Sequence, residues 1–510
     1  MQKAPKVEPP AFICFTHMRK KILYFAILLL LPLFLSAQSP IWLEGAVFLD
    51  KNQNGSRDKG ERALKHIPVS NGKDIVYTDA NGNYRIAVEQ GQSVFPILPS
   101  GYTIAGDKAS RVKNSLFYYI TENSTAAQHN EFALTHEEQL TSFRIGAIGD
   151  IQVGDATELN YAGKSIFREL ASRDDISFHM VLGDLVNDNL DLFTPFKAML
   201  EVMPAPSWTV LGNHDRDIDQ ANRSDHSFNT EFGASTYAFN YGGVHFIVLN
   251  NVFSTGKHSY EGRISDDQLQ FLVNDLKNVA PGTQLVICQH IPMAYTRNRT
   301  EALGLLDRFS NVLILSGHTH QVGRHFYNGG NVQEIVTGAP SGNWWTGEKN
   351  LHGIPDALMQ CGSPRNYFTI DFKKSKYAFQ FKGIGLDEEQ QMDLTLRGDT
   401  LITNLYAASD STTVEFQIDQ REWTPMHHVD RPAESVLCVI ENNKDKQFPA
   451  SGNRINPLRK RASPHIWQTI IGALLPGSHT IRIRAFDRFG YTVETTETIF
   501  VPPGGNLIVL

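Results

Sequence analysis

Five apolar segments between residues 143 and 317 are each followed by a side chain that can bind a metal ion. The segments are FRIGAIG, FHMVLG, SWTVLG, QLVICQ and NVLILSG, and continuous apolar runs predict strands covered on both faces. The residues that follow them are Asp150 and Gln152, Asp184, Asn213 and His214, His290, and His318 and His320. One such histidine alone is more often structural than a ligand. Because open α/β sheets bind ligands beyond the carboxyl ends of their strands, five such ends predict that these side chains converge.

The types of side chain restrict the metal. The set holds two carboxylates, two carboxamides and three imidazoles, which are Asp150, Asp184, Gln152, Asn213, His290, His318 and His320. Oxygen and nitrogen donors without thiolate suit Mn, Fe or Zn, with Mg as an alternative. Seven ligands are too many for one transition-metal ion, but they are the right number for two ions that share a carboxylate. A two-ion site can hold a bridging hydroxide and bind phosphate oxygens, which predicts hydrolysis of a phosphoester or phosphoanhydride.

The motifs GDIQ, GDLVND, GNHD, the lone histidine of CQHIPM, and GHTH occur in this order. This series resembles that of the calcineurin-like metallophosphoesterases, over residues 143–340 by motif. The flanking segments are similar to the N-terminal and C-terminal β domains of a bacterial branch of that family. The resemblance implies an α/β fold with a central four-layer α/β/β/α sandwich between two all-β sandwich domains.

The family pattern implies a role for each motif residue. It implies one metal ion at Asp150, Gln152, Asp184 and His320 and a second at Asp184, Asn213, His290 and His318, so that Asp184 bridges. It also implies that His214 binds a phosphate oxygen and stabilises the transition state or protonates the leaving group.

Two residues depart from that pattern. Many members have histidine in place of Gln152, whose single carbonyl donor should hold an ion more weakly than imidazole. Other members have aspartate at the position of Asn187, where it orients the catalytic histidine. This chain leaves Asp188 or Asp215 as candidates for that role.

Substrate contacts are less well defined. Arg216, Arg297 and Arg299 follow motif residues, and their planar guanidinium groups could contact phosphate, although a solvated side chain is the alternative for each. Trp344 and Trp345 lie in the Gly-rich segment GAPSGNWWTGEKNLHGIP, where their rings could stack on a base or sugar or could plug the sheet edge. Arg216, Trp344 and Trp345 are therefore the candidate substrate-binding residues.

The chain divides into four parts. Residues 1–37 have a basic start, an apolar centre and a small-residue end, which predicts a cleaved signal peptide, with Met18 as an alternative start and an uncleaved anchor as the alternative fate. Residues 38–138 predict a β-sandwich, 139–375 the catalytic domain, and 376–510 an immunoglobulin-like β domain. Within the catalytic domain, Ser265 is the expected N-cap of a helix with Leu269, Leu272 and Leu276 on one face.

The N-terminal β domain contains the segment DKNQNGSRDKGE. Its oxygen-bearing side chains are Asp50, Asn52, Asn54, Asp58 and Glu61, and their alternation around Gly55 resembles a calcium loop. The glutamate falls at the twelfth position, as in an EF-hand loop, but no helices are expected to flank the segment, so a structural calcium site and a polar turn remain alternatives. Among the cysteines, Cys288 predicts a buried thiol, and Cys361 and Cys438 could pair in an exported protein.

These features give three functional hypotheses. The leading one is an exported dinuclear-metal phosphohydrolase, periplasmic, in the cell envelope or secreted, in which a metal-bridged hydroxide attacks a phosphomonoester or phosphodiester of a nucleotide, glycan or lipid. The Asp-x-Gln variant is similar to that of manganese-dependent ADP-ribose and CDP-alcohol pyrophosphatases, so a nucleoside-diphosphate-type pyrophosphatase is an alternative. A surface binding or adhesion protein with a silent catalytic domain is the alternative of another class.

The overall charge and hydropathy agree with these hypotheses. A formal charge of -7, from 47 Lys and Arg against 54 Asp and Glu, does not indicate nucleic-acid coating. We expect no stable transmembrane span after removal of the signal peptide.

Overall fold

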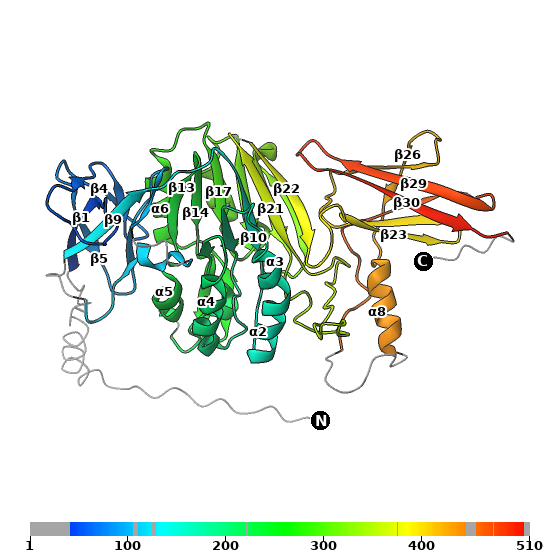
Figure 1. Cartoon of the computed structure of the whole chain (residues 1–510), viewed down its shortest axis with the longest axis horizontal. Coiled ribbons are helices and arrows are strands. Elements are labelled where there is room, and N and C mark those ends of the chain that lie inside the picture. The colour runs from blue at the N-terminus through cyan, green and yellow to red at the C-terminus, as the bar shows by residue number, and fades with distance from the viewer. Residues whose placement is uncertain are drawn as a thin grey trace, which may run out of the picture. The chain divides into compact units, whose positions relative to one another are not determined.

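The computed structural model describes residues 41–105, 111–124, 129–220, 223–374, 376–444, 455–472 and 474–503. The predicted signal peptide, residues 1–37, lies outside these residues. Figure 1 labels many of the elements that follow. None of the described helices combines the length and the apolar character that crossing a membrane requires.

Residues 41–136 form two small β-sheets, as the alternating pattern predicts. One has the order β2-β1-β9-β7, with β5 also paired to β1, and the other has the order β4-β3-β6-β8. The strands are β1 (Ile41–Leu49), β2 (Arg62–Ala63), β3 (Pro68–Ser70), β4 (Ile75–Tyr77), β5 (Asn83–Val88), β6 (Ser93–Pro96), β7 (Tyr102–Ile104), β8 (Tyr118–Tyr119) and β9 (His129–His136). Buried Val47, Ile86 and Leu134 contribute to the core of this sandwich.

The predicted calcium loop follows β1 and is closed by its own side chains. Asp50 accepts hydrogen bonds from the backbone N–H groups of Gln53 and Gly55, at 2.6 and 2.8 Å. Asp58 accepts from the side-chain amides of Asn52 and Asn54, at 2.8 and 2.9 Å. Glu61 accepts from the N–H groups of Lys51 and Asp58, both at 2.9 Å. The carboxylates thus hold the turn together, and calcium binding by this loop stays a prediction.

The central part contains two packed sheets. The first has the order β12-β11-β10-β21-β22 and the second β13-β14-β17-β18-β20-β19. The strands are β10 (Ser142–Ile148), β11 (Phe178–Val181), β12 (Ser207–Thr209), β13 (Tyr237–Tyr241), β14 (Val244–Val248), β17 (Gln284–Cys288), β18 (Val312–Ser316), β19 (Val322–Tyr327), β20 (Val332–Thr337), β21 (Asn366–Lys373) and β22 (Lys376–Gly383). A separate hairpin pairs β15 (Val252–Gly256) with β16 (Ser259–Gly262).

Aromatic side chains join the two sheets. Phe178 of β11 packs edge-on against Phe246 of β14 with ring centroids 5.3 Å apart, and Phe372 of β21 also packs against Phe246, at 5.9 Å. Continuous apolar strands predict sheets that are buried on both faces. These aromatic contacts bury the faces that the two sheets turn toward each other. The first sheet extends through β22 to Gly383, past residue 375, where the sequence suggested that the catalytic domain ends.

Helices cover the outer faces of the two sheets. The helices are α2 (Ala156–Ala162), the π-helical turn η3 (Gly163–Phe167), α3 (Arg168–Leu170), α4 (Phe193–Glu201), α5 (His226–Phe232), α6 (Asp266–Leu276) and α7 (Arg299–Gly304). Phe167 of η3, Phe196 of α4 and Phe232 of α5 form one buried cluster with Ile148 and Val181 of the first sheet.

Helix α6 forms as predicted. Its N-cap residue Ser265 accepts a hydrogen bond from the N–H of Gln268, at 3.3 Å. Leu269, Leu272 and Leu276 are all buried on one face, in the cluster that contains the second sheet. The predicted four-layer α/β/β/α arrangement is confirmed.

The C-terminal part is a second β-sandwich. Its sheets have the orders β23-β24-β28-β27 and β26-β25-β29-β30. Its elements are β23 (Met392–Arg397), β24 (Thr400–Leu405), β25 (Thr413–Ile418), β26 (Thr424–Pro425), β27 (His427–His428), α8 (Glu434–Lys444), β28 (Ile466–Ile470), β29 (Gly477–Phe486) and β30 (Thr492–Val501). Cys288, Cys361 and Cys438 are all free thiols, so the suggested pair of Cys361 and Cys438 is not formed.

Candidate metal centre

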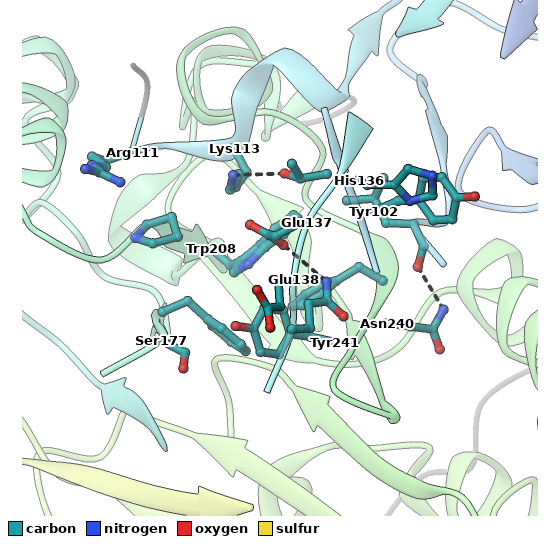
Figure 2. A pocket seen from close by; sticks show the side chains of 16 residues that line it. Tyr102, Arg111, Lys113, His136, Glu137, Glu138, Ser177, Trp208, Asn240 and Tyr241 are labelled. Atoms are coloured by element: carbon teal, nitrogen blue, oxygen red, sulfur yellow. Dashed lines mark hydrogen bonds between the residues drawn. The ribbon is translucent and has the colours of Figure 1, made fainter. Parts of the chain in front are cut away.

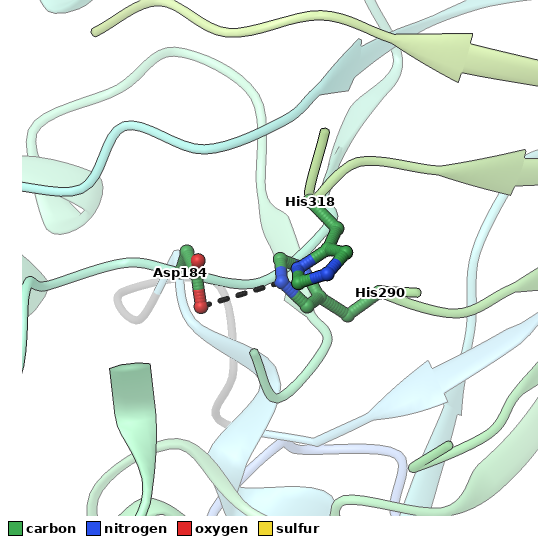
Figure 3. A group of neighbouring side chains, drawn as sticks. All are labelled: Asp184, His290 and His318. Atoms are coloured by element: carbon green, nitrogen blue, oxygen red, sulfur yellow. Dashed lines mark ion pairs between the residues drawn. The ribbon is translucent and has the colours of Figure 1, made fainter. Parts of the chain in front are cut away.

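The strand ends converge as the sequence predicts. Asp184 follows β11, His290 follows β17 and His318 follows β18, and one donor atom from each lies within 4.8 Å of the others. Figure 3 shows the two imidazoles side by side and facing the carboxylate, with Nε2 of His290 3.4 Å from Oδ1 of Asp184. Three elements far apart in the sequence therefore supply one compact donor group.

The other four predicted ligands join this group. Oδ1 of Asn213 lies 3.1 Å from Nε2 of His290. Nε2 of Gln152 lies 3.4 Å from Oδ2 of Asp184, and Nε2 of His320 lies 3.7 Å from Oδ1 of Asp150. Asp184 contacts both Gln152 and His290, as a ligand shared by two ions would have to. Their role as ligands stays a prediction.

Strained backbone brings these side chains together. Gln152, Asp184, His318 and His320 all have positive φ angles, of 45, 50, 72 and 50°. Residues with side chains rarely adopt this left-handed conformation, and such strain is concentrated at functional sites.

Two of the glycines that precede the predicted ligands are required by close approach. A Cβ atom on Gly212 would lie 2.2 Å from Oδ1 of Asp184, and one on Gly317 would lie 2.5 Å from Oδ2 of Asp150. Both distances are far below van der Waals contact, so any side chain at these positions would displace a carboxylate of the group.

Backbone groups orient the donors. The N–H of His318 donates to both oxygens of Asp150 at 2.9 Å, and the N–H of His214 donates to Oδ1 of Asp184 at 2.9 Å. Nδ1 of His290 lies 2.8 Å from the carbonyl of Leu182, and Nδ1 of His320 lies 2.5 Å from that of Gly342. Because a carbonyl can only accept, Nδ1 carries the hydrogen in both imidazoles. Nε2 is then the atom available to a metal ion, in the arrangement usual for metal-binding histidines.

The electrostatics favour cations. Asp150 and Asp184 are 0 and 1 % exposed, and within the described part of the chain their only ion-pair partners are histidines. Burial raises the pKa of Asp150. Burial opposes protonation of His290, yet the carboxylates of Asp184 and Asp150 raise its pKa to about 9. One protonated imidazole does not balance two ionised carboxylates, so the group favours further positive charge.

Two buried atoms in the group also lack partners. Oε1 of Gln152 and Nδ1 of His318 have no hydrogen-bond partner among the described residues. Burial and the neighbouring His290 lower the pKa of His318 to about 3, which keeps its imidazole neutral as metal binding requires. Together with the oxygen and nitrogen donors, these atoms fit a pair of divalent cations.

His214 lies beside this group and contacts Asp188. Its Nδ1 is 2.9 Å from Oδ1 of Asp188. Burial lowers the pKa of His214, but the Asp188 carboxylate 2.9 Å away and the charge of Asp184 outweigh burial, so the pKa of His214 is raised. Of the two candidates for orienting His214, Asp188 is in contact.

Asp215 has another role. It is fully buried, and its carboxylate accepts hydrogen bonds from the backbone N–H groups of Leu185, Val186 and Gly212, at 2.9, 3.1 and 2.9 Å. The assignment of Asp215 as a catalytic group is therefore corrected. It fastens the loop after β11 to the loop after β12, and so holds Asp184 and Asn213 together.

Arg216 lies close to the metal group together with Tyr260, which the sequence analysis missed. Nε of Arg216 donates to the carbonyl of Asn213 at 3.0 Å, and Nη1 to that of Ser259 at 3.3 Å. Its guanidinium lies 4.9 Å from the ring centroid of Tyr260, which also packs edge-on against His318 at 6.1 Å. Tyr260 belongs to the β15–β16 hairpin and follows no motif, so no sequence signal marked it.

The two tryptophans differ. Trp344 is 44 % exposed and stacks on His320 with ring centroids 4.5 Å apart, beside the donor group. Trp345 is 1 % exposed, and its Nε1–H donates to the carbonyl of Ile151 at 3.0 Å. Trp345 is therefore a core residue, and its assignment as a substrate contact is corrected.

The two other arginines lie apart from the donor group. Arg297 forms an exposed ion pair with Glu261 at 3.0 Å. Arg299 donates to the carbonyl of Ala294 at 3.2 Å. Neither contacts a predicted ligand, so the structure gives no support for phosphate binding by these two.

A separate pocket of about 490 Å³ lies at the amino ends of the strands, away from the donor group. Figure 2 shows its polar lining, which includes Glu137, Glu138 and Tyr241. Ser177 and Pro206, which also line it, directly precede β11 and β12. Since ligands of such sheets bind at the carboxyl ends, this pocket is not the candidate active site.

Three family models match consecutive parts of the chain. The model described as "Calcineurin-like phosphoesterase" matches residues 143–322 and covers all seven predicted ligands. The models for the "N terminal" and the "C terminal of Calcineurin-like phosphoesterase" match residues 51–137 and 334–492. A search of curated proteins finds no match.

Solved structures with a similar arrangement are distant in sequence. Purple acid phosphatase PPD1 from yellow lupin seeds is 14 % identical, with 68 % of this chain and 67 % of that chain covered and a TM-score of 0.35. GAP50 of Plasmodium is 15 % identical, with 47 and 84 % covered and a TM-score of 0.33. Vps29 of Chaetomium thermophilum is 13 % identical, with 56 and 95 % covered and a TM-score of 0.22. At these values the structures carry no argument about activity.

Proposed function

Because the chain belongs to the calcineurin-like phosphoesterase family, whose members are metal-dependent phosphoesterases, we propose that it is an exported phosphohydrolase acting on phosphomonoesters or phosphodiesters. The observation that carries the proposal is the convergence of Asp184, His290 and His318 from three strand ends, beside His214. Export to the periplasm, the cell envelope or the medium is supported by the signal-peptide pattern of residues 1–37.

The seven predicted ligands would hold two divalent ions, with Asp184 shared. Mn, Fe and Zn suit the donors best, and Mg remains an alternative. When bound, such a pair lowers the pKa of a water molecule and neutralises phosphoryl charge. The buried carboxylates and the neutral His318 provide the environment in which ions of this kind are retained.

His214 serves as proton donor or as a ligand of the phosphoryl group. Asp188 engages its Nδ1, so Nε2 is the atom left to face a substrate. In hydrolysis, a water oxygen bonds to phosphorus, the bond from phosphorus to the leaving oxygen breaks, and that oxygen takes a proton from Nε2. The proton that the water loses then restores the protonated imidazole of His214. Because the N–H of His214 donates to Asp184, its backbone is fixed relative to the donor group.

Arg216 binds a phosphate oxygen in this proposal. Its guanidinium is fixed by two backbone carbonyls and the ring of Tyr260, and no described carboxylate forms an ion pair with it. A buried cation without an anionic partner is stabilised by an anionic ligand.

A nucleoside-diphosphate-type pyrophosphatase is the second candidate. Gln152 favours it, because the amide stands where many members have histidine and its Oε1 has no partner among the described residues. The sequence variant Asp-x-Gln is similar to that of manganese-dependent pyrophosphatases, and hydrolysis of an anhydride needs the same donor group.

The test is hydrolysis of p-nitrophenyl phosphate, bis-p-nitrophenyl phosphate and ADP-ribose by protein reconstituted with Mn²⁺, Fe²⁺ or Zn²⁺. We expect activity on at least one ester, which Asp184→Ala and His290→Ala abolish. Preference for ADP-ribose over both esters would favour the pyrophosphatase. No activity with any metal would overturn the proposal and favour a silent catalytic domain in a binding protein.

A further inference from the structure

A polar cleft runs along β19, the edge strand of the second sheet. It consists of two adjoining cavities, of about 210 and 400 Å³, which share Arg324, His325, Ser409 and Asp410. Arg324 and His325 lie on β19, whereas Ser409 and Asp410 belong to the loop between β24 and β25 of the C-terminal sandwich. Clefts of this size at the boundary between two domains are common ligand sites.

The cleft opens beside the candidate metal centre. Thr319 and Gln321 line the smaller cavity, and Thr319 lies between the predicted ligands His318 and His320. Pro292, two residues after the predicted ligand His290, lines the same cavity. A group bound there is therefore close to any phosphate held by the metal centre.

A buried ion pair fixes the two walls of the cleft. Nη1 of Arg324 lies 2.7 Å from Oδ2 of Asp487, and the two side chains are 1 and 0 % exposed. The guanidinium also lies 4.7 Å from the ring centroid of Phe379 and 5.3 Å from that of Tyr491. Arg324 belongs to β19 and Asp487 directly follows β29. The ion pair therefore joins the edge strand of the second sheet to the C-terminal sandwich.

The uncommitted side chains define the chemistry of the cleft. Within the described residues, the side chains of Gln321, His325 and Asp410 form no hydrogen bond or ion pair with protein groups and are at least partly exposed. An amide, an imidazole and a carboxylate together offer both donors and acceptors. Tyr295, at the rim, is 65 % exposed and presents an apolar ring with a polar tip.

This lining favours a neutral, hydroxyl-rich group over the other candidates. Asp410 disfavours a second anion in the smaller cavity, beside the reacting phosphate, whereas the cation Arg299 lines only the larger cavity. The polar side chains disfavour an acyl chain, which would leave them without partners. Alternating donors and acceptors next to one aromatic ring suit the hydroxyl groups and the C–H face of a sugar.

We propose that this cleft binds the sugar of a sugar phosphate, so that the C-terminal sandwich selects the leaving group. The inference rests on the proposed function, because it places the reacting phosphate at the metal centre. In it, Gln321, His325 and Asp410 hydrogen-bond the sugar hydroxyls, and Tyr295 covers one face of the ring.

The experiment uses the Mn²⁺-loaded protein and compares kcat/KM for glucose, galactose and N-acetylglucosamine 1-phosphates with kcat/KM for p-nitrophenyl phosphate. The measured quantity is the ratio of the best sugar phosphate to p-nitrophenyl phosphate. We expect Asp410→Ala and His325→Ala each to lower this ratio about five- to tenfold, the loss typical of one hydrogen bond. Glu422→Ala, which removes an exposed carboxylate elsewhere in the C-terminal sandwich, is the matched control and should leave the ratio unchanged.

An unchanged ratio in both variants would overturn the inference. Adenosine 5′-monophosphate is the further probe: if it is preferred to every sugar phosphate and Trp344→Ala alone lowers its rate, the leaving group is a nucleoside and the inference fails. If wild-type protein hydrolyses neither these monoesters nor bis-p-nitrophenyl phosphate, it is the proposed function that fails. The cleft is then judged by saturation-transfer NMR with maltose: transfer that weakens in Asp410→Ala supports it, and no transfer or equal transfer overturns it.

Discussion

Oδ1 of Asp188 lies 2.9 Å from Nδ1 of His214, one residue after the position where other family members carry the orienting aspartate. Backbone geometry explains how the later residue reaches the histidine. Asp188 has a φ of 61°, and its N–H donates to the carbonyl of His214 at 3.2 Å. This left-handed turn redirects the chain after Asn187, so that Asp188 contacts His214 through both backbone and side chain.

The first prediction concerns this contact. We expect Asp188→Ala to lower kcat on p-nitrophenyl phosphate at least about tenfold, because an unoriented His214 transfers a proton less effectively. KM should change little. Steady-state kinetics is the measurement, with Asp191→Ala, an exposed carboxylate nearby, as control. Equal kcat for Asp188→Ala and wild type would show that the contact has no catalytic role.

The second prediction concerns Gln152. Its carbonyl is the only donor it can offer, whereas imidazole binds Mn, Fe and Zn more tightly. We therefore expect that removing one of the two ions from Gln152→His takes an EDTA concentration about tenfold or more above the concentration that removes it from wild type. The measurement is metal content after dialysis against graded EDTA. Identical stripping curves would mean that Gln152 contributes no donor.

The third prediction concerns Tyr260. Its ring supports the guanidinium of Arg216 and the imidazole of His318, and a cation–π contact contributes about 0.5–2 kcal/mol. We expect Tyr260→Leu to raise KM for phosphoesters about 2- to 30-fold, while Tyr260→Phe stays near wild type. Steady-state kinetics and competitive inhibition by inorganic phosphate measure this. A loss shared equally by both variants would point to the hydroxyl group and contradict the ring contact.

The fourth prediction concerns stability in acid. Burial, reinforced by the charge of Arg173, lowers the pKa of His179 to about 4, and its two ring nitrogens have no partners among the described residues. In the unfolded chain its pKa is near 6.5, so between about pH 6.5 and 4 only the unfolded state binds this proton. The free energy of unfolding should therefore be highest above about pH 6.5 and should fall by up to about 1.4 kcal/mol per pH unit as the pH drops.

Urea unfolding from pH 7 to pH 4.5 checks this. We expect His179→Leu to flatten the fall, and the exposed-histidine control His352→Gln to keep it. A fall of the same steepness in His179→Leu would place the acid sensitivity on other groups, such as buried His465, whose pKa burial also lowers to about 4.

Much of the site could be predicted because its residues follow directly from strand ends. Asp150, Asp184, His290 and His318 each come within a few residues of a buried strand, and the edge at which parallel strands end is determined by the fold class. Helix α6 could be predicted for the same reason, since capping and apolar spacing are local signals.

The errors have a common physical origin in contacts that are not local. Trp344 and Trp345 are neighbours with φ angles of 55 and 50°, and only the folded backbone decides that one ring faces outward and the other enters the core. Asp215 looked catalytic because it follows His214, but its carboxylate is taken by amides of a loop about 30 residues earlier. Tyr260 reaches the site through a hairpin that no motif marks.

The central claim, that these strand ends hold two ions through a shared carboxylate, is tested most directly by the metal content of Asp184→Asn. Inductively coupled plasma mass spectrometry after reconstitution with Mn²⁺ and gel filtration should give about two ions per wild-type chain. Because Asp184 contacts both halves of the donor group, the variant should retain well under one ion, with an unchanged circular dichroism spectrum. Two ions retained by Asp184→Asn, or none by wild type, would contradict the account.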